Sequence, residues 1–282
     1  MNMPETPALG VPDLAPVTGQ DFREALRRGL RDLTRAPIYA LVFGLPYVLG
    51  GWAMVWLTLA TGQSYWLIFA AIGFPLVAPF AAVGFYDVSR RIERGEALAW
   101  RPVLAVIFAQ SGRQIPWLGA IVLVIFLFWF FLAHMIFALF LGLSTMTNVS
   151  SSLAIYLTPE GLSMLAVGSV VGAGFAVLLY MISVLSLPLL LDREVDFVTA
   201  MITSFQFVAA QPVAMFAWGA FIAGVTFVAM LPGFLGLLVV LPLFGHATWH
   251  LYDILAYGSG SADIGQGARG KPRVTRSSKA AS

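Results

Sequence analysis

The residues best suited to chemistry in this chain are two histidines and an aspartate near its C-terminal end. His246, His250 and Asp253 follow the spacing H-x3-H-x2-D, which places all three side chains on one face of a helix. Two histidines at positions i and i+4 can chelate a metal ion, and Asp87 is the best candidate for a further ligand. Alternatively, His250 belongs to an interfacial aromatic belt while His246 hydrogen-bonds to a neighbouring helix. We favour the second interpretation and expect no cofactor.

Three aspartates stand at the ends of apolar stretches. Asp87, Asp192 and Asp253 end the second, fourth and sixth of these stretches. An aspartate at a helix C-terminus is locally unfavourable, because that end carries partial negative charge. The three carboxylates either converge as an acidic rim that binds a cation or opens a pore, or they pair with arginines. We favour pairing, because arginine is abundant at this level of the chain: Arg35, Arg90, Arg91, Arg113 and Arg193.

Composition places these residues in a membrane protein. The 282-residue chain is 59% hydrophobic and 11% charged, which is too apolar for an ordinary soluble domain. It contains no cysteine, which excludes disulfides, thiolate catalysis and Cys-ligated clusters. The first twenty residues lack the cationic start and the apolar core of a cleaved signal peptide.

Six apolar stretches are long enough to cross a bilayer as helices, which takes about 20 residues each. The predicted spans are residues 36–61, 65–87, 115–143, 162–191, 212–231 and 233–256. We therefore predict an all-α membrane domain over residues 18–257. A disordered leader over 1–17 and a disordered basic tail over 258–282 flank it.

The positive charges predict one orientation for these spans. Of the sixteen Lys and Arg residues, five precede the first span, five lie between the second and third, one follows the fourth and five lie in the tail. Cytoplasmic loops are enriched in Lys and Arg. The distribution therefore predicts a multi-pass protein of a bacterial inner membrane with both termini in the cytoplasm.

Three shorter segments read as helices that lie in the cytoplasmic headgroup plane. The first has an apolar stripe of Phe22, Leu26, Leu30 and Leu33 against an Arg-rich remainder, and Thr18 with Asp21 can cap its start. Residues 100–109 and 195–210 form the other two, the last with polar residues three or four apart. The first segment is expected to anchor on the membrane surface, or alternatively to dock an acidic partner.

The first and third of these segments agree in spacing, which suggests internal repeats. Phe22 is followed by Pro37 fifteen residues later, and Phe197 is followed by Pro212 at the same interval. The middle copy keeps only Pro116, with Trp100 in a similar place. We predict three hairpin repeats, each preceded by a cytoplasmic interfacial helix.

The spans carry little else that could do chemistry. Apart from His134 and His246, their middle sections have no ionisable side chain, whereas proton-coupled pumps usually place one there. His134 is expected near the far rim, bonded to a carbonyl. Gly168, Gly172 and Gly174 predict a close-packing face on the fourth span. No phosphate-binding glycine loop or nucleophile elbow is present, so we expect no enzyme activity.

The six-span pattern, the Arg-rich helix before the first span and the endings Phe85-Tyr86-Asp87 and Leu251-Tyr252-Asp253 resemble a known family. The resemblance covers roughly residues 18–257 and is to predicted integral membrane proteins of unknown function from Gram-negative bacteria. Some members carry a cytochrome c oxidase subunit I label. This chain departs from that label, because it has three histidines and half the spans of a true catalytic subunit.

Together these features predict a non-enzymatic accessory, assembly or scaffold component of the membrane. The expected partners are a bilayer with anionic headgroups and a membrane-protein complex, and nucleic acid is not expected. The alternative is a passive channel or small transporter lined by the repeat interfaces.

Overall fold

Helices make up most of the computed structural model, which describes residues 8–62, 67–142 and 153–258. The longer helices are α2 (Pro37–Thr61), α3 (Leu67–Arg94), α5 (Ile115–Leu141), α7 (Pro159–Ser183), α10 (Pro212–Met230) and α11 (Leu237–Tyr257). The shorter ones are α1 (Gly19–Arg35), α4 (Trp100–Ser111), α8 (Ser186–Asp192), α9 (Phe197–Ala210) and the 3-10 turn η1 (Leu153–Leu157). Two two-residue strands, β1 (Ala8–Leu9) and β2 (Arg193–Glu194), pair in parallel.

Five helical segments of the described chain are long and apolar enough to cross a membrane. They are α2, α5, the stretch Pro159–Asp192 that includes α7 and α8, α10, and α11. The remaining predicted span, residues 65–87, falls largely within the 28-residue helix α3. An all-α architecture with several apolar helices is thus confirmed. The count of six membrane spans stays a prediction.

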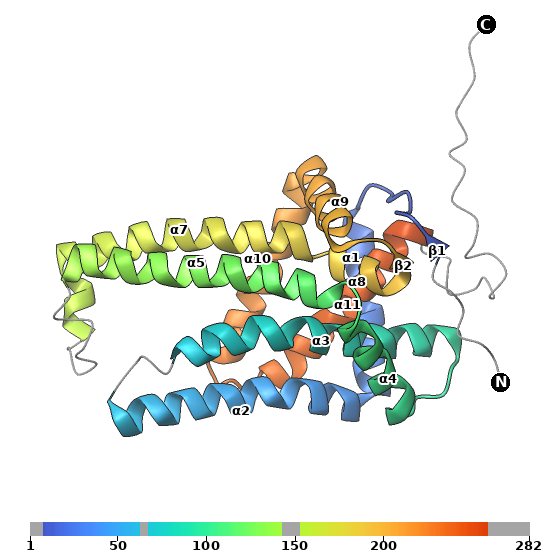
Figure 1. The fold of residues 1–282 in the computed structure, drawn as a ribbon, viewed down its shortest axis with the longest axis horizontal. Helices are drawn as coiled ribbons and strands as arrows, with labels where there is room; N and C mark the ends of the chain where they lie inside the picture. The colour runs from blue at the N-terminus through green and yellow to red at the C-terminus, as the bar shows by residue number, and fades with distance from the viewer. Residues whose placement is uncertain (1–7, 63–66, 143–152, 259–282) are drawn as a thin grey trace, which may run out of the picture.

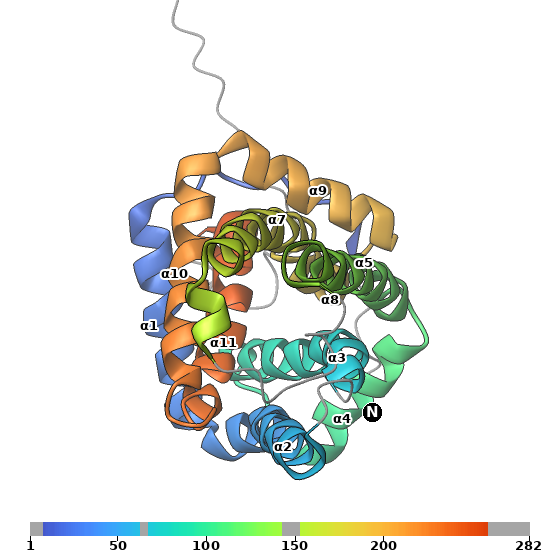
Figure 2. The ribbon, with the colours of Figure 1, turned by 90° about the vertical axis from the view of Figure 1, so that its left-hand side faces the viewer.

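The short helices α1, α4 and α9 lie toward one end of the molecule, at the right in Figure 1. Seen along the long helices, they lie around the outside of the bundle (Figure 2). Each leads into a longer helix that begins with proline at its first or second position, at Pro37, Pro116 and Pro212. Proline suits this position because its missing N–H has no intrahelical partner there. Equivalence of the three units as repeats stays a prediction.

The core of the protein sits at the same end, around the second half of α11. Every residue from His246 to Ala256 is buried, because α1, α2, α3, α8 and α10 all pack against this helix. Trp249 and Tyr252 are the largest fully buried side chains. Elsewhere α5 and α7 expose many apolar side chains, as lipid-facing helices do.

Two helix boundaries differ from those predicted. The helix of the second span does not end at Asp87 but continues to Arg94, because Asp87 pairs with arginines three and four residues later. The fourth span is interrupted between Ser183 and Ser186. Pro188 explains this break, since a proline inside a helix clashes with the carbonyl four residues earlier.

Helix α1 is docked into the protein rather than resting on the membrane surface alone. Its buried residues are Ala25, Arg28, Gly29 and Asp32, a stripe that faces α11 and lies beside the predicted apolar stripe. Of the apolar stripe, Leu30 is 53% exposed. The predicted cap is present, because the Asp21 carboxylate accepts hydrogen bonds from the Thr18 amide and hydroxyl, both at 2.7 Å.

The predicted disordered leader is wrong for residues 8–17, which pack against the bundle. β1 pairs with β2, and the amide of Ala15 donates to the Leu255 carbonyl at 2.9 Å. The amide of Val17 donates to the Gln211 side chain at 2.6 Å. Backbone partners from α11 and the start of α10 thus order this segment. Residues 1–7, and the predicted tail from 259 onward, lie outside the described residues.

Candidate functional site

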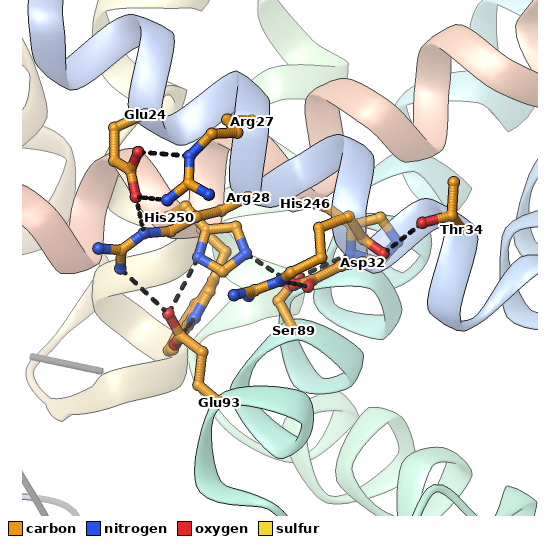
Figure 3. A network of polar contacts seen from close by, with 11 residues as sticks. Glu24, Arg27, Arg28, Asp32, Thr34, Ser89, Glu93, His246 and His250 are labelled. Carbon is orange, nitrogen blue, oxygen red and sulfur yellow. Dashed lines mark hydrogen bonds and ion pairs between the residues drawn. The ribbon is translucent and has the colours of Figure 1, made fainter. Parts of the chain in front are cut away.

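Three helices each bring polar side chains four residues apart to the centre of this end of the bundle. Glu24, Arg28 and Asp32 form one stripe on α1. Ser89 and Glu93 lie one turn apart on α3, and His246 and His250 lie one turn apart on α11. Spacings of four residues place side chains on the same helix face. The three faces meet in the network shown in Figure 3.

His250 is at the centre of this network and bridges two carboxylates from different helices. Its Nε2 lies 2.6 Å from Oδ2 of Asp32, and its Nδ1 lies 3.0 Å from Oε1 of Glu93. The side chains of His250 and Asp32 are fully buried, and that of Glu93 is 1% exposed. A single imidazole therefore joins α1 to α3 through α11.

Arginine and tryptophan side chains surround the two carboxylates. The Nε of Arg31 donates to Asp32 at 2.9 Å, and the indole of Trp249 donates to Glu93 at 3.1 Å. Arg28 forms an ion pair with Glu93 at 3.6 Å while its Nε donates to Glu24 at 2.7 Å. Buried charges are tolerated only when they are paired and hydrogen-bonded. Each carboxylate here has more than one donor.

The charge state of α1 follows from these contacts. Burial alone would raise the pKa of Asp32, but hydrogen bonds from His250 and Arg31 outweigh it and hold the pKa below its ordinary value. Hydrogen bonding to Arg27 and Arg28 lowers the pKa of Glu24 to about 2. The carboxyl groups of Glu24 and Asp32 are therefore ionised at neutral pH.

His246 occupies a neighbouring position in which one ring nitrogen is bonded. Its Nδ1 lies 2.8 Å from the hydroxyl oxygen of Ser89, and both residues are fully buried. The Nε2 of His246 is buried and has no hydrogen-bond partner among the described residues. The ring packs edge-on against Phe85, with 5.4 Å between centroids. The predicted hydrogen bond of His246 to a neighbouring helix is present, to α3.

Close backbone approach allows α1 to reach this network. A Cβ atom at Gly29 would lie 2.9 Å from the backbone nitrogen of Ala247 and 3.0 Å from the carbonyl oxygen of Leu243. Glycine is therefore required where α1 crosses α11, because any side chain would strike the backbone itself. Arg28, directly before Gly29, and Asp32, three residues after it, thereby gain access to the interior.

The sequence-predicted metal ligands are not brought together around an open position. Both nitrogens of His250 contact carboxylates, which leaves no ring nitrogen for a metal. Asp253 is buried on the same helix. Within the described ranges, no group of three or more His, Cys, Asp or Glu side chains is arranged to hold a metal ion.

The two other predicted aspartates have partners of their own. Asp87 pairs with Arg90 at 2.5 Å and Arg91 at 2.7 Å, both on α3. Asp192 accepts a hydrogen bond from Tyr252 at 2.8 Å and lies 3.4 Å from Arg193. These contacts are of the kind favoured from the sequence, pairing of the aspartates with nearby arginines.

His134 lies apart from this site on α5. Its Nδ1 is 2.8 Å from the carbonyl oxygen of Phe130, one turn earlier, as predicted. Its side chain is on the exposed surface of the described structure. His134 therefore belongs to the lipid-facing side of the bundle.

Sequence reasoning missed five members of the network: Glu24, Arg28, Asp32, Ser89 and Glu93. Its candidate for a partner of the His pair was Asp87, whereas the structure uses Glu93, almost two turns further along α3. The four-residue spacing shared by the α1, α3 and α11 groups is the signal that could have found them. The amphipathic pattern instead predicts that the charged residues of α1 form the polar face of a helix at the membrane surface.

Comparison with known proteins supports the class of protein. Residues 67–192, from α3 to α8, match the family described as predicted integral membrane protein (DUF2189). The resemblance to a family of unknown function is thereby confirmed, and the cytochrome c oxidase label receives no support. With its apolar helices, the chain is a multi-pass integral membrane protein. No curated protein and no solved structure matches it.

Proposed function

We propose that the protein is a non-enzymatic accessory, assembly or scaffold component of the bacterial inner membrane. In this proposal the short helices α1, α4 and α9, here called the collar, present a fixed cytoplasmic surface to a partner complex and to anionic headgroups. The observation that carries the proposal is the buried ionic network at the end of the bundle where the collar lies. Buried charges hold α1 in place, because Asp32, Glu93 and His250 fix this helix to the bundle.

The outer surface of the collar supports the same proposal. Arg23, Arg27, Arg35 and Arg101 are exposed on α1 and α4. On α9, Val198, Ile202 and Phe205 are 47%, 50% and 41% exposed, a stripe with helical spacing. Exposed arginines beside an exposed apolar stripe suit the boundary between headgroups and acyl chains.

Affinity purification from native membranes in mild detergent tests the proposal. We expect a stable, stoichiometric partner on the wild-type protein and its loss when Arg23, Arg27 and Arg35 are all changed to Glu. The matched control changes Arg269, Arg273 and Arg276 of the tail to Glu, with the same change in net charge. Equal loss of the partner in both variants would show a non-specific charge effect and contradict a collar-specific surface.

Flux measurements on purified protein in liposomes test the alternative function, a passive channel or small transporter. A scaffold component is expected to move no ion or small solute. Solute movement that is lost on Asp87→Asn or Asp253→Asn would contradict the proposal and would instead support a channel.

A further inference from the structure

The bonding of His250 imposes a condition on its protons. Asp32 is ionised at neutral pH and accepts hydrogen bonds, and an ionised Glu93 does the same. A neutral imidazole has one N–H and one lone pair, so it can donate to only one of them. The second nitrogen would then direct its lone pair at a carboxylate oxygen about 3 Å away. For both ring nitrogens to form hydrogen bonds with ionised carboxylates, each nitrogen must therefore carry a proton.

We propose that the Asp32–His250–Glu93 bridge is a proton-dependent latch that docks α1 against α3 and α11. In the doubly protonated state His250 donates to both carboxylates, and α1 is held. Loss of one proton to water breaks one of the two hydrogen bonds and leaves a buried negative charge without its counter-charge. This latch is expected to operate whether or not a partner binds the collar.

The charges that face His250 explain why its second proton determines the net charge of the buried network. From α1 come Arg28 and Asp32, with Arg31 and Glu24 bonded behind them, and from α3 comes Glu93. With His250 protonated, the buried set of Arg28, Asp32, Glu93 and His250 sums to zero. Without that proton the set carries one net negative charge in a water-poor interior, where it is strongly unfavourable.

Within the part of the chain that the structure describes, the other elements packed on α11 place no compensating cation at His250. The sequences of α2 and α10 contain no Asp, Glu, Lys, Arg or His. From α8, Asp192 is bonded to Tyr252 and Arg193. On α11 itself, His246 bonds to Ser89, and Asp253 is buried three residues beyond His250. The nearest groups therefore add little positive charge to replace the lost proton.

A released α1 has a second position available. Its stripe of Phe22, Leu26, Leu30 and Leu33, opposite exposed arginines, is suited to the membrane surface. A single residue, Ala36, joins it to α2, so a change of backbone angle at one position is enough to reorient it. Two alternative positions with complementary surroundings are what a switch requires. The docked state buries the ionic stripe and packs Phe22 and Leu26 against the core, while Leu30 stays exposed. Release would turn the whole apolar stripe toward the membrane surface.

Cysteine labelling can measure the docking, because the chain has no native cysteine. Ala25, fully buried on α1, is changed to Cys, and Leu30, exposed on the same helix, is changed to Cys in a second protein. Maleimide labelling of each full-length protein in liposomes is followed from about pH 5.5 to about pH 9.5, a range that includes the ordinary imidazole pKa of about 6.5. The ratio of the two rates cancels the thiolate's own pH dependence.

We expect the Ala25-to-Leu30 labelling ratio to rise about tenfold or more from the acidic to the alkaline end of this range. His250→Gln, which cannot carry the charge, should raise the ratio at every pH and remove its pH dependence. His134→Gln, a histidine change remote from the latch, should leave the profile unchanged. A ratio that stays constant with pH in the His250 protein would overturn the proposal, even if the Gln variant fails to fold.

Hydrogen–deuterium exchange on the cysteine-free chain gives a second measurement that avoids the Ala25 substitution. At one neutral pH, His250→Gln should lower the protection of the α1 amides about tenfold while α5 stays protected. Equal protection of α1 in both proteins would count against the latch. Loss of protection throughout would assign His250 a general structural role and overturn it as well.

Discussion

At Gly29 the backbones of α1 and α11 approach so closely that a single methyl group would not fit. Backbone atoms of Ala247 and Leu243 lie within about 3 Å of the position that a Cβ would take. Neither atom can turn away as a side chain can. The residues that carry charge into the interior, Arg28 and Asp32, depend on this contact for their reach. The ionic contacts of Arg28 and Asp32 thus depend on the absence of a side chain at Gly29.

Gly29→Ala is therefore expected to lower the free energy of unfolding by about 1–3 kcal/mol, through overpacking and separation of the helices. Thermal unfolding in mild detergent measures this. Gly19→Ala is the matched control on the same helix, because a Cβ there meets nothing within 4 Å. Equal unfolding temperatures for the two variants would show that the α1–α11 contact relaxes freely.

Acid should also weaken α1 docking, independently of His250 deprotonation. The pKa of Asp32 is held below its ordinary value, against burial, by hydrogen bonds from His250 and Arg31, and bonds to Arg27 and Arg28 lower that of Glu24 to about 2. A lowered folded-state pKa contributes stability above the unfolded value of about 4, and this contribution is lost as pH falls through the folded pKa. The unfolding temperature should thus fall below about pH 4.

Asp32→Asn should make this acid dependence shallower and lower stability at neutral pH by about 3–5 kcal/mol, because it leaves His250 and Arg31 without their buried counter-charge. Glu96→Gln breaks the exposed pairs with Arg91 and Arg94 and should cost under about 1 kcal/mol. An unchanged acid profile in Asp32→Asn would contradict the assignment to this carboxyl group.

At the scale of the helices, the break between α7 and α8 shows how a side chain of one helix can supply hydrogen bonds that the backbone of another lacks. Pro188 ends the regular hydrogen bonding of the long apolar segment, and the Leu185 amide is left without a helical partner. Ser204 on α9 accepts from this amide at 3.1 Å and donates to the Met181 carbonyl at 2.7 Å. A short surface helix thus satisfies the backbone of an apolar one.

Ser204→Ala should cost about 1–3 kcal/mol, because it leaves a buried N–H and a buried C=O unpaired. The control is Ser163→Ala on α7, whose exposed hydroxyl bonds within its own helix and whose loss should change stability by less than about 0.5 kcal/mol. Both are read from unfolding midpoints in the same detergent. A cost at Ser204 no larger than at Ser163 would mean that α9 is only loosely attached.

For the molecule as a whole, the decisive property is the gathering of charge and short helices at one end. The positive-inside bias predicts that this end faces the cytoplasm, and Figure 1 places α1, α4 and α9 together there. An even number of crossings would put both chain ends on that side. This membrane topology stays a prediction from the sequence, and the fold is compatible with it.

A topology reporter fused after Ala256 is expected to read cytoplasmic, as is one fused before Thr18. A reporter inserted between residues 144 and 150 should read periplasmic. A periplasmic signal after Ala256 would overturn the arrangement and would make an odd number of spans necessary.

The sequence by itself determined the class of protein, the approximate position of the apolar helices and the existence of the short helices before them. These are properties of local pattern: apolar length, helical periodicity, proline position and the bias of Lys and Arg. The arginine pairing of Asp87 also lay within reach, because its partners stand three and four residues away on one helix.

Only the tertiary structure decided what His250 contacts. Glu93 and Asp32 lie 157 and 218 positions away from it in the chain, and no local pattern relates them. Their meeting depends on the close crossing at Gly29 and on α3 continuing past Asp87 to Glu93. The amphipathicity of α1 was evident, but two of its faces could be buried, one by lipid and one by protein. Packing against α11 selects the charged face, because partners there neutralise each of its buried charges.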